Sequence, residues 1–301
     1  MISFEGSEGN KLVGNIFGDR EAPVALLLHG GGQTRHAWAR PARELAESGW
    51  CTIAIDLRGH GQSEWVKSGN YSFADFASDN AAVARQIEAR FGHKPVVIGA
   101  SLGGISALLA EGEADHPLFA ALVMVDITPS VEREGVNHIR GFMSQRLEEG
   151  FASIEEAADA VAAYLPNRKR PPNAEGLKKN LRLHEDGRYR WHWDPRFING
   201  ERPIDNGRDE VAPRFAAAAR GIDIPTLLVR GRQSELVKDA HVREFLELVP
   251  HARYTDISEA GHMVAGDRND IFASAVAEFL DHFRHAPEAL MVAKGRRSEL
   301  R

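Results

Sequence analysis

The stretch Pro95-Val-Val-Ile98, followed by Gly99-Ala-Ser101-Leu-Gly103, decides the fold that this sequence predicts. Its first part is a short apolar, β-branched run typical of a buried strand, and a helical pattern starts at Ile105. A G-x-S-x-G motif between a strand and a helix predicts a sharp turn that exposes the serine hydroxyl. Glycines leave room for the tight turn, and the helix points its first amides toward the serine. Ser101 is therefore the candidate nucleophile.

Similar apolar runs recur along the chain, with amphipathic helical stretches between them. The other runs are Val24–Leu28, Thr52–Ile55, Leu122–Val125, Thr226–Val229 and Tyr254–Ile257. The helical stretches are Ala37–Glu47, Phe73–Arg90, Ile105–Glu111 and Val237–Leu248. This alternation predicts an α/β fold with a mostly parallel, doubly wound sheet. The opening segments Ile2–Glu5 and Lys11–Phe17 predict an antiparallel hairpin at one edge of the sheet.

The alternation stops between about residues 128 and 219, where helix-forming and aromatic stretches replace the buried strands. We expect this segment to be a helical cap inserted into a core formed by residues 1–127 and 220–290. Residues 291–301 are basic and lack periodicity, which predicts a flexible tail.

Composition excludes several classes of protein. Hydrophobic residues make up 43% of the 301, enough for a sizeable core, and 37 basic against 43 acidic residues give a net charge of −6. That balance argues against a nucleic-acid partner. Cys51 is the only cysteine, so the chain has neither an intrachain disulfide nor a thiolate metal cluster. We find no secretory signal and no membrane-spanning run, and we expect a cytoplasmic protein.

A glycine-rich motif supplies the second element of a catalytic site. His29-Gly-Gly-Gly32-Gln33 follows the strand Val24–Leu28 directly. Successive glycines allow backbone amides to approach a developing oxyanion, and no phosphate-loop pattern is present. We expect the Gly31 and Leu102 amides to form the oxyanion hole, with His29 orienting the loop.

The general base and its supporting acid come from later in the chain. His262 follows the last predicted strand, from which an imidazole can reach the nucleophile. A buried carboxylate must hold that imidazole. Asp126, at the end of Leu122–Val125, and Glu235, after Thr226–Val229, are both candidates.

Together with Asp56-Leu-Arg-Gly-His-Gly61-Gln-Ser63, these motifs resemble the α/β-hydrolase superfamily, specifically its capped serine hydrolases. Members commonly place the acid at the last position of Gly-x-x-Asp, where this chain has Ser234, one residue before Glu235. A subset moves the acid to the end of the preceding strand, including amide hydrolases that act on ring-opened vitamin B6 breakdown products. Val125-Asp126-Ile-Thr-Pro129 resembles that arrangement, which favours Asp126. The resemblance also implies that Asp56 and Arg58 hold the loop beside the oxyanion residues.

The predicted function is hydrolysis of a small or medium carboxylic ester or lactone through an acyl-enzyme, without a cofactor. A serine nucleophile suits acyl transfer, whereas the related haloalkane dehalogenases and epoxide hydrolases need a carboxylate there. Hydrolysis of a C–C bond or an amide, and cofactor-free perhydrolysis, use the same triad and stay open. A non-catalytic ligand receptor is the alternative from another class, and the Ser101–His262 pair argues against it. The expected partner is a small-molecule acyl substrate, and a homodimer is compatible with this chain. Candidate pocket residues are Trp38, Trp191, Trp193 and Met263.

Overall fold

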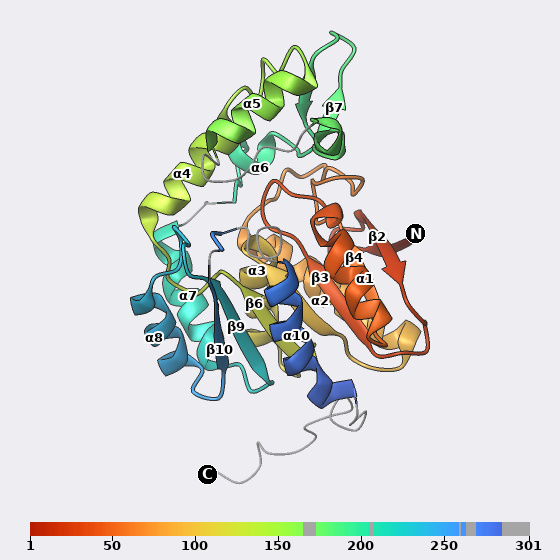
Figure 1. Cartoon of the computed structure of the whole chain (residues 1–301), viewed down its shortest axis with the longest axis vertical. Helices are drawn as coiled ribbons and strands as arrows, with labels where there is room; N and C mark the ends of the chain where they lie inside the picture. Colours follow the sequence, from red (N-terminus) through yellow and green to blue (C-terminus); the bar gives the residue numbers. More distant parts are fainter. Residues whose placement is uncertain (165–172, 205–207, 259, 263–268, 285–301) are drawn as a thin grey trace.

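The computed structural model describes residues 1–164, 173–204, 208–258, 260–262 and 269–284, so the predicted tail at 291–301 lies outside the described residues. An eight-stranded sheet forms its centre, in the order β1-β2-β4-β3-β5-β6-β9-β10 (Figure 1). The strands are β1 (Ile2–Glu5), β2 (Lys11–Phe17), β3 (Val24–Leu28), β4 (Cys51–Ile55), β5 (Val96–Ala100), β6 (Ala121–Val125), β9 (Thr226–Gly231) and β10 (Arg253–Ile257). β2 is antiparallel to both β1 and β4, and all other neighbours are parallel. The predicted doubly wound α/β fold is confirmed.

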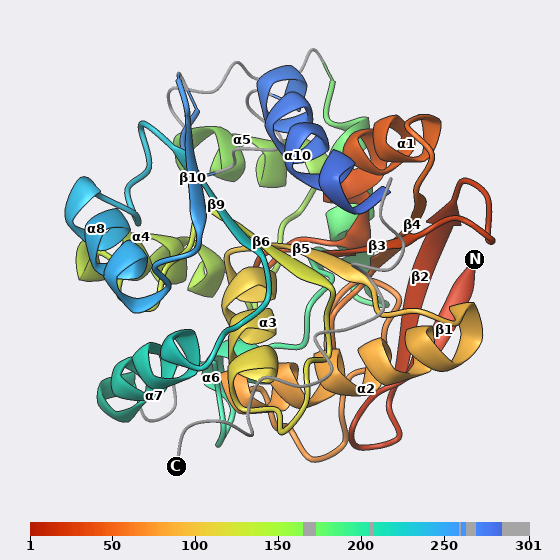
Figure 2. The same cartoon turned by 90° about the horizontal axis from the view of Figure 1, so that it is seen from below.

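Alternate residues of the central strands enter two different cores, one on each face of the sheet. In β3, Leu26 and Leu28 belong to one core, whereas Ala25 and Leu27 belong to the other. Helices cover both faces (Figure 2). The first core is covered by α2 (Phe73–Phe91), α3 (Leu102–Gly112), α7 (Arg208–Arg220) and α8 (Asp239–Leu248). The second is covered by η1 (Arg35–Trp38), α1 (Ala39–Glu47) and α10 (Asn269–Arg284). Burial on both faces explains the continuous apolar runs.

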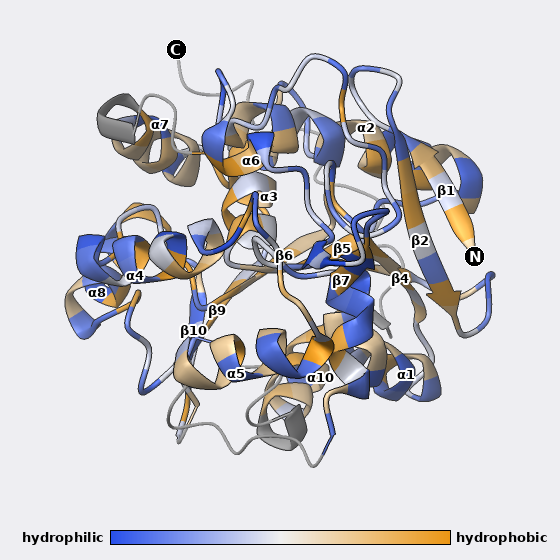
Figure 3. Ribbon diagram, turned by 90° about the horizontal axis from the view of Figure 1, so that it is seen from above, coloured by the Kyte–Doolittle hydropathy of each residue, from blue (hydrophilic) through white to orange (hydrophobic). Residues whose placement is uncertain are grey.

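The segment between β6 and α7 lies above the central sheet (Figures 1 and 3). It contains α4 (Arg133–Ser144), α5 (Ile154–Tyr164), η2 (Glu175–Asn180), β7 (Leu181–Leu183), β8 (Tyr189–Trp191) and α6 (Arg196–Asn199). The antiparallel hairpin of β7 and β8 differs from the purely helical segment that the sequence predicts. Strands of three residues are too short to produce a clear two-residue period. The division into core and cap stays a prediction.

The last helix of the predicted cap segment, α7, packs against α3 of the core. The contact is tight, because a side chain on Gly112 would collide with the Ala218 carbonyl. Among the helices of the described residues, none has the length and apolarity that crossing a bilayer would require.

Candidate active site

The backbone turns sharply at Ser101, which stands between β5 and α3 with φ 46° and ψ −115°. A positive φ at a non-glycine residue costs of order 1–3 kcal/mol and persists only where the surroundings hold it. The chain crosses itself closely on both sides of the serine. A Cβ on Gly99 would lie 2.5 Å from Gly104 N, and one on Gly103 would lie 2.5 Å from Leu28 O. The two glycines of the motif are therefore required by close backbone contact.

The loop after β3, residues 29–33, is called here the glycine loop, and two of its three glycine amides are already hydrogen-bonded. Gly30 N–H donates to Gln33 Oε1 at 3.0 Å, and Gly32 N–H donates to His60 Nε2 at 3.1 Å. For Gly31 N–H, the described residues supply no acceptor. This amide is therefore available to a ligand.

At the turn around Ser101, too, neighbouring amides are hydrogen-bonded and one amide is left without an acceptor among the described residues. Ser101 N–H donates to Val125 O at 3.1 Å, and Gly103 N–H donates to His29 O at 3.2 Å. Leu102 N–H opens helix α3 and finds no acceptor in the part of the chain that the structure describes. First-turn amides have no partner within their own helix, so this donor is also available.

The two available amides belong to segments that touch each other beside Ser101. A Cβ on Gly30 would lie 3.4 Å from Ser101 Cβ, and one on Gly31 would lie 3.9 Å from Leu102 Cδ2. The structure therefore brings the predicted oxyanion residues, Gly31 and Leu102, to the candidate nucleophile. Ser101 itself is half-buried, and its Oγ has no hydrogen-bond partner among the described residues.

A buried carboxylate holds the segment that directly follows the glycine loop. Asp56 accepts a hydrogen bond from Arg35 N–H at 2.7 Å, and it also pairs with the Arg35 guanidinium. Arg58, which the resemblance assigns to the same task, instead binds Asp79 at 2.6 and 2.7 Å. Asp56 therefore supports the loop as expected, whereas Arg58 ties α2 to the core.

Buried histidines fix the remaining groups of the glycine loop. Leu57 N–H donates to His29 Nε2 at 3.0 Å, so the proton of His29 sits on Nδ1 and donates to Gly30 O at 2.8 Å. His29 therefore orients the loop, as the sequence predicts. Since both ring nitrogens are occupied, it has no lone pair left with which to act as a base.

Two further histidines, His60 and His192, were not predicted to act here. His60 accepts the Gly32 N–H at Nε2 and donates its Nδ1–H to Arg58 O at 2.8 Å. His192 accepts from Gly61 N–H at 2.7 Å and donates through Nε2 to Gly32 O at 3.3 Å. His60 lies within the motif Asp56–Ser63 that the sequence analysis quotes. His192, in contrast, is 160 residues away from Gly32 in the sequence, and no local pattern indicates their contact.

Acid pH is expected to destabilise the fold through these histidines. Burial lowers the pKa of His29 to about 4 and that of His60 to about 3, and it also lowers the pKa of His192 well below the usual range. The unfolded chain takes up these protons near pH 6.5. The contribution of these histidines to the free energy of unfolding is therefore complete above that pH and falls as the pH drops toward 4. For His29 alone the loss at the acid end is about 3 kcal/mol.

Urea unfolding at a series of pH values between 6.5 and 4 measures this loss. His60→Gln keeps an acceptor for the Gly32 amide without titrating, so the variant should show a shallower dependence on pH. The exposed His184, replaced by glutamine, is the matched control and should leave the dependence unchanged. Equal pH dependence in all three proteins would contradict the role of the buried histidines.

Asp126 lies at the end of β6 and is held by three hydrogen bonds. Its Oδ1 accepts from Gly231 N–H at 3.0 Å, and its Oδ2 accepts from Ser234 Oγ at 2.6 Å and from His262 Nδ1 at 2.7 Å. The carboxylate is fully buried, and the residue has a φ of 51°. Ser101 and Asp126 are two of the three non-glycine residues with positive φ in the described ranges. Ser101 and Asp126 directly follow Ala100 and Val125, which are partners in the sheet, so the two strained residues lie at the ends of adjacent strands.

Ser234 occupies the position where related chains commonly carry the acid, and here its hydroxyl serves Asp126. While donating to the carboxylate, Ser234 Oγ accepts the amides of Leu236 and Val237 at 3.0 and 3.1 Å. It therefore fixes the Asp126 side chain to the loop after β9. The sequence marked this serine only as a departure from the family pattern.

Ser234→Ala is expected to lower kcat about tenfold while leaving KM within about twofold, because the Asp126 carboxylate loses one charged hydrogen bond. Ser234→Thr keeps the hydroxyl and should retain most of the activity. Steady-state kinetics on an ester substrate distinguish the two. A proportional rise in KM with unchanged kcat would assign Ser234 to substrate binding instead.

The segment carrying His262 is anchored to the loop after β9. Arg232 N–H donates to Ile257 O at 3.0 Å, and Gln233 N–H donates to Ala260 O at 2.9 Å. Gly231 has no room for a side chain, since the Gly261 carbonyl lies against it. These contacts place the imidazole beside Asp126.

Glu235, the alternative acid, faces a different partner. Its Oε2 lies 2.9 Å from Nδ1 of His138, in helix α4. The Glu235 side chain is 38% exposed, whereas Asp126 is completely buried. The geometry therefore favours Asp126 over Glu235 as the partner of His262.

The aromatic pocket candidates separate into two groups. The rings of Trp191 and Trp193 stack at 4.9 Å, and Trp193 lies against Gly32, where a Cβ would be 3.3 Å from its ring. Trp38 instead packs in the core against Phe272 at 5.9 Å, where the end of η1 turns its side chain toward α10, and its role as a pocket residue stays a prediction. The remaining candidate, Met263, lies outside the described residues.

Comparison with known proteins gives consistent relatives. The alpha/beta hydrolase fold family matches residues 23–268. The chain is 32% identical over 270 residues to an esterase of Mycobacterium tuberculosis, covering 86% of this chain and 83% of that protein. It is 29% identical over 281 residues to 2-(acetamidomethylene)succinate hydrolase of Mesorhizobium japonicum, covering 89% and 91% of the two chains.

A solved structure supports the same fold. The crystal structure of E-2-(acetamidomethylene)succinate hydrolase aligns with a TM-score of 0.77 at 24% identity, over 93% of this chain and 99% of that one. The matched family covers most of the chain, including both strands that precede Ser101 and Asp126. The chain therefore belongs to the alpha/beta hydrolase fold family and is a hydrolase of that fold.

Proposed function

We propose that this protein is a serine hydrolase that cleaves a small or medium carboxylic ester or lactone through an acyl-enzyme. The observation that carries the proposal is the 2.7 Å hydrogen bond between His262 Nδ1 and Asp126 Oδ2. It lies one strand away from Ser101, which is held at positive φ on a turn between strand and helix. These are the nucleophile, base and orienting acid that acyl transfer requires.

In the proposed first step, Ser101 Oγ bonds to the substrate carbonyl carbon while its proton moves to His262 Nε2. That nitrogen carries the lone pair because Nδ1–H donates to Asp126. The carbonyl π electrons move to oxygen, and the amides of Gly31 and Leu102 stabilise the resulting oxyanion. Asp126 stabilises the imidazolium that forms beside it.

The tetrahedral intermediate then collapses to the acyl-enzyme. Its C–O bond to the leaving group breaks, and His262 Nε2 returns its proton to the departing alkoxide. Water repeats the sequence in place of the serine, releasing the acid and regenerating Ser101. The chain supplies the first nucleophile, the general base and the oxyanion donors, water is the second nucleophile, and we propose a reaction without a cofactor.

Apolar side chains beside the glycine loop support a small or medium acyl group. A Cβ on Gly32 would lie 2.9 Å from Met143 Cε, and one on Gly31 would lie 3.5 Å from the ring of Phe197. Both side chains come from the segment above the sheet. We propose that this segment is a cap and that Trp193 contributes to the same wall.

Hydrolysis of p-nitrophenyl acetate and butyrate tests the proposal. Rapid mixing should show a burst of about one p-nitrophenolate per chain, followed by slower turnover, if an acyl-enzyme accumulates. The short-chain esters should be preferred over a long-chain ester. A protein that hydrolyses none of a panel of esters, lactones and amides would contradict the proposed function.

Amide hydrolysis is the second candidate, favoured by the similarity to 2-(acetamidomethylene)succinate hydrolase. The placement of Asp126 at the end of β6 also resembles the acid position of such hydrolases. Matched p-nitrophenyl esters and p-nitroanilides with the same acyl group separate the two reactions. Comparable kcat/KM values for both would favour the amide, because activated esters are intrinsically the easier substrates.

A further inference from the structure

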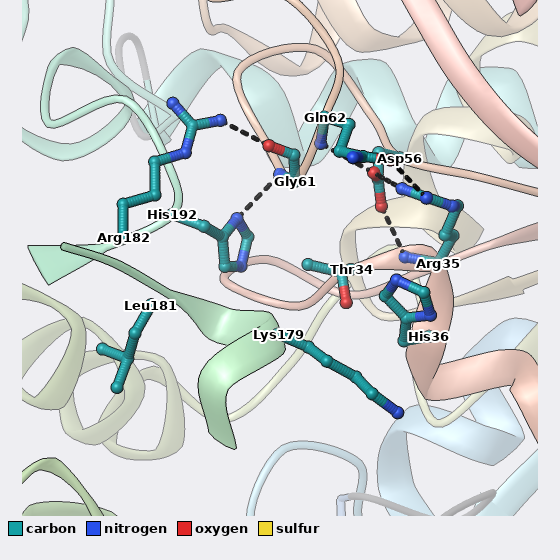
Figure 4. Close-up of a pocket in the computed structure, with 10 residues that line it drawn as sticks. All are labelled: Thr34, Arg35, His36, Asp56, Gly61, Gln62, Lys179, Leu181, Arg182 and His192. Atoms are coloured by element: carbon teal, nitrogen blue, oxygen red, sulfur yellow. Dashed lines mark hydrogen bonds and ion pairs between the residues drawn. The ribbon is translucent and has the colours of Figure 1, made fainter. Parts of the chain in front are cut away.

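A cavity of about 170 Å³ lies between the core loops and the segment above the sheet (Figure 4). Its core wall comes from η1 and from the loop after β4, and its other wall comes from η2, β7 and the residue after β8. Neither Ser101 nor His262 lines it. At about 30 Å³ per water in the liquid, the space matches roughly five or six waters, or a small organic acid.

Positive charge predominates in this lining. Arg35, Lys179 and Arg182 face one carboxylate, Asp56, which leaves an excess of two positive charges. Asp56 is already bound by the Arg35 amide and guanidinium and by Gln62 N–H at 2.8 Å. The direct contacts of its carboxylate are therefore all with Arg35 and Gln62, and its single charge, which also acts through space on Arg182, faces three cations.

Lys179 and Arg182 lack a carboxylate partner among the described residues. The Lys179 side chain has no hydrogen bond or ion pair there, and Figure 4 draws none. Arg182 donates through Nη2 to the Gly61 carbonyl and stacks over Trp65 at 5.0 Å, and the carboxylates of Asp56 and Asp194 act on it through space without forming an ion pair with it. Burial lowers the pKa of the Arg182 guanidinium, which indicates a cation partly removed from water.

The His36 imidazole is a third group of the lining that interacts electrostatically with these cations. Burial and the positive charge of Arg35 lower the pKa of this half-buried imidazole, Asp56 acts in the opposite direction, and Lys179 lowers the pKa further. A bound anion would offset both charges and supply an acceptor for a protonated ring. The cavity is therefore arranged for a negatively charged occupant.

We propose that this cavity binds a small carboxylate, with Arg182 and Lys179 as its cationic contacts. A half-buried guanidinium suits the planar carboxylate, and the ammonium adds a charged donor. The occupant would sit behind the glycine loop, because His192 lines the cavity and also donates to Gly32 O. Two sources of the carboxylate are distinguished below: a second acid group on the substrate, or a free carboxylate that acts on the loop.

Binding is tested first, without reference to catalysis. The Ser101→Ala protein is titrated with succinate by isothermal calorimetry at constant ionic strength, with succinamide as the uncharged comparison. We expect saturable binding of succinate alone, weakened about tenfold by Arg182→Gln and several-fold by Lys179→Gln. Lys178→Gln is the matched control, because that neighbouring lysine pairs with Glu175 at 2.8 Å and does not line the cavity.

Lys179→Gln keeps the test sharp if Arg182→Gln fails to fold, since an exposed side chain without a partner contributes little to stability. Absence of saturable binding, or equal affinity in Lys179→Gln and Lys178→Gln, overturns the proposal. A loss of ester hydrolysis in the wild type would not affect this result, so the two proposals fail independently.

Enzyme kinetics then identify the source of the bound carboxylate, and this part of the test rests on the proposed function. Two p-nitrophenyl esters are compared, one with a terminal carboxylate on the acyl chain and one with the corresponding methyl ester. A preference for the acidic substrate that disappears in Lys179→Gln identifies the substrate as the source. Succinate-dependent kcat for the neutral ester, lost in the same variant, identifies a free carboxylate.

Discussion

Ser101→Ala is expected to reduce kcat for p-nitrophenyl acetate by about 10⁵- to 10⁶-fold. The reason is that the variant removes the one protein atom proposed to form a bond with the acyl carbon. Its neighbours stay in place, because the amide of residue 101 still donates to Val125 O and the helix α3 still begins at Leu102. Residual hydrolysis would come from binding and from the Gly31 and Leu102 amides.

Initial rates of p-nitrophenolate release, with the unfolding midpoint measured in parallel, provide the test. The exposed Ser78 on α2, replaced by alanine, is the matched control and should hydrolyse at the wild-type rate. Alanine keeps the Cβ of serine and therefore the same steric cost at this positive φ, so the stability of Ser101→Ala should stay close to that of the control. A folded Ser101→Ala protein with more than a tenth of the wild-type rate would contradict the assignment.

The second large effect is expected at Asp126. Asp126→Asn should lower kcat at least several hundred-fold and up to about 10⁴-fold. An asparagine retains the volume but removes the negative charge that stabilises the imidazolium. It also permits the His262 tautomer in which Nε2 carries the proton, which cannot accept one from Ser101. The fixed carboxylate geometry, with two other donors on the same group, makes compensation by rotation difficult.

Glu235→Gln is the control for this charge change, and its kcat should stay within about twofold of the wild type. Its side chain contacts His138 on the surface and not the triad. Parallel kinetics of both variants on one ester give the comparison. The reverse pattern, with Glu235→Gln inactive and Asp126→Asn active, would move the acid to Glu235.

The sequence predicted the sheet because its physical cause is local. Strands buried on both faces must be apolar throughout, so β3 was predicted with the bounds Val24–Leu28 that the structure has. The turn at Ser101 could also be predicted from the sequence. Backbone contacts at Gly99 and Gly103 exclude side chains, so both positions require glycine and produce a recognisable motif. The helix after it was predicted to start at Ile105, but it begins at Leu102 because the turn feeds directly into the helix.

The less local features could not be predicted in this way. His192 reaches the glycine loop from the distant β8 segment, and the orientation of Trp38 depends on its contact with α10. Asp126 and Glu235 were both acceptable by position, and only the contacts of each carboxylate separate them. Such choices depend on tertiary packing, which short patterns do not record.

The most direct test of the central claim is covalent labelling with a serine-directed fluorophosphonate, followed by intact mass and peptide mapping. The proposed mechanism predicts one adduct per chain, on the peptide that contains Ser101, and none in Ser101→Ala. Asp126→Asn should label much more slowly, because the base that activates the serine is no longer held. An adduct on another residue, or labelling that persists in Ser101→Ala, would contradict the assignment of Ser101 as the nucleophile.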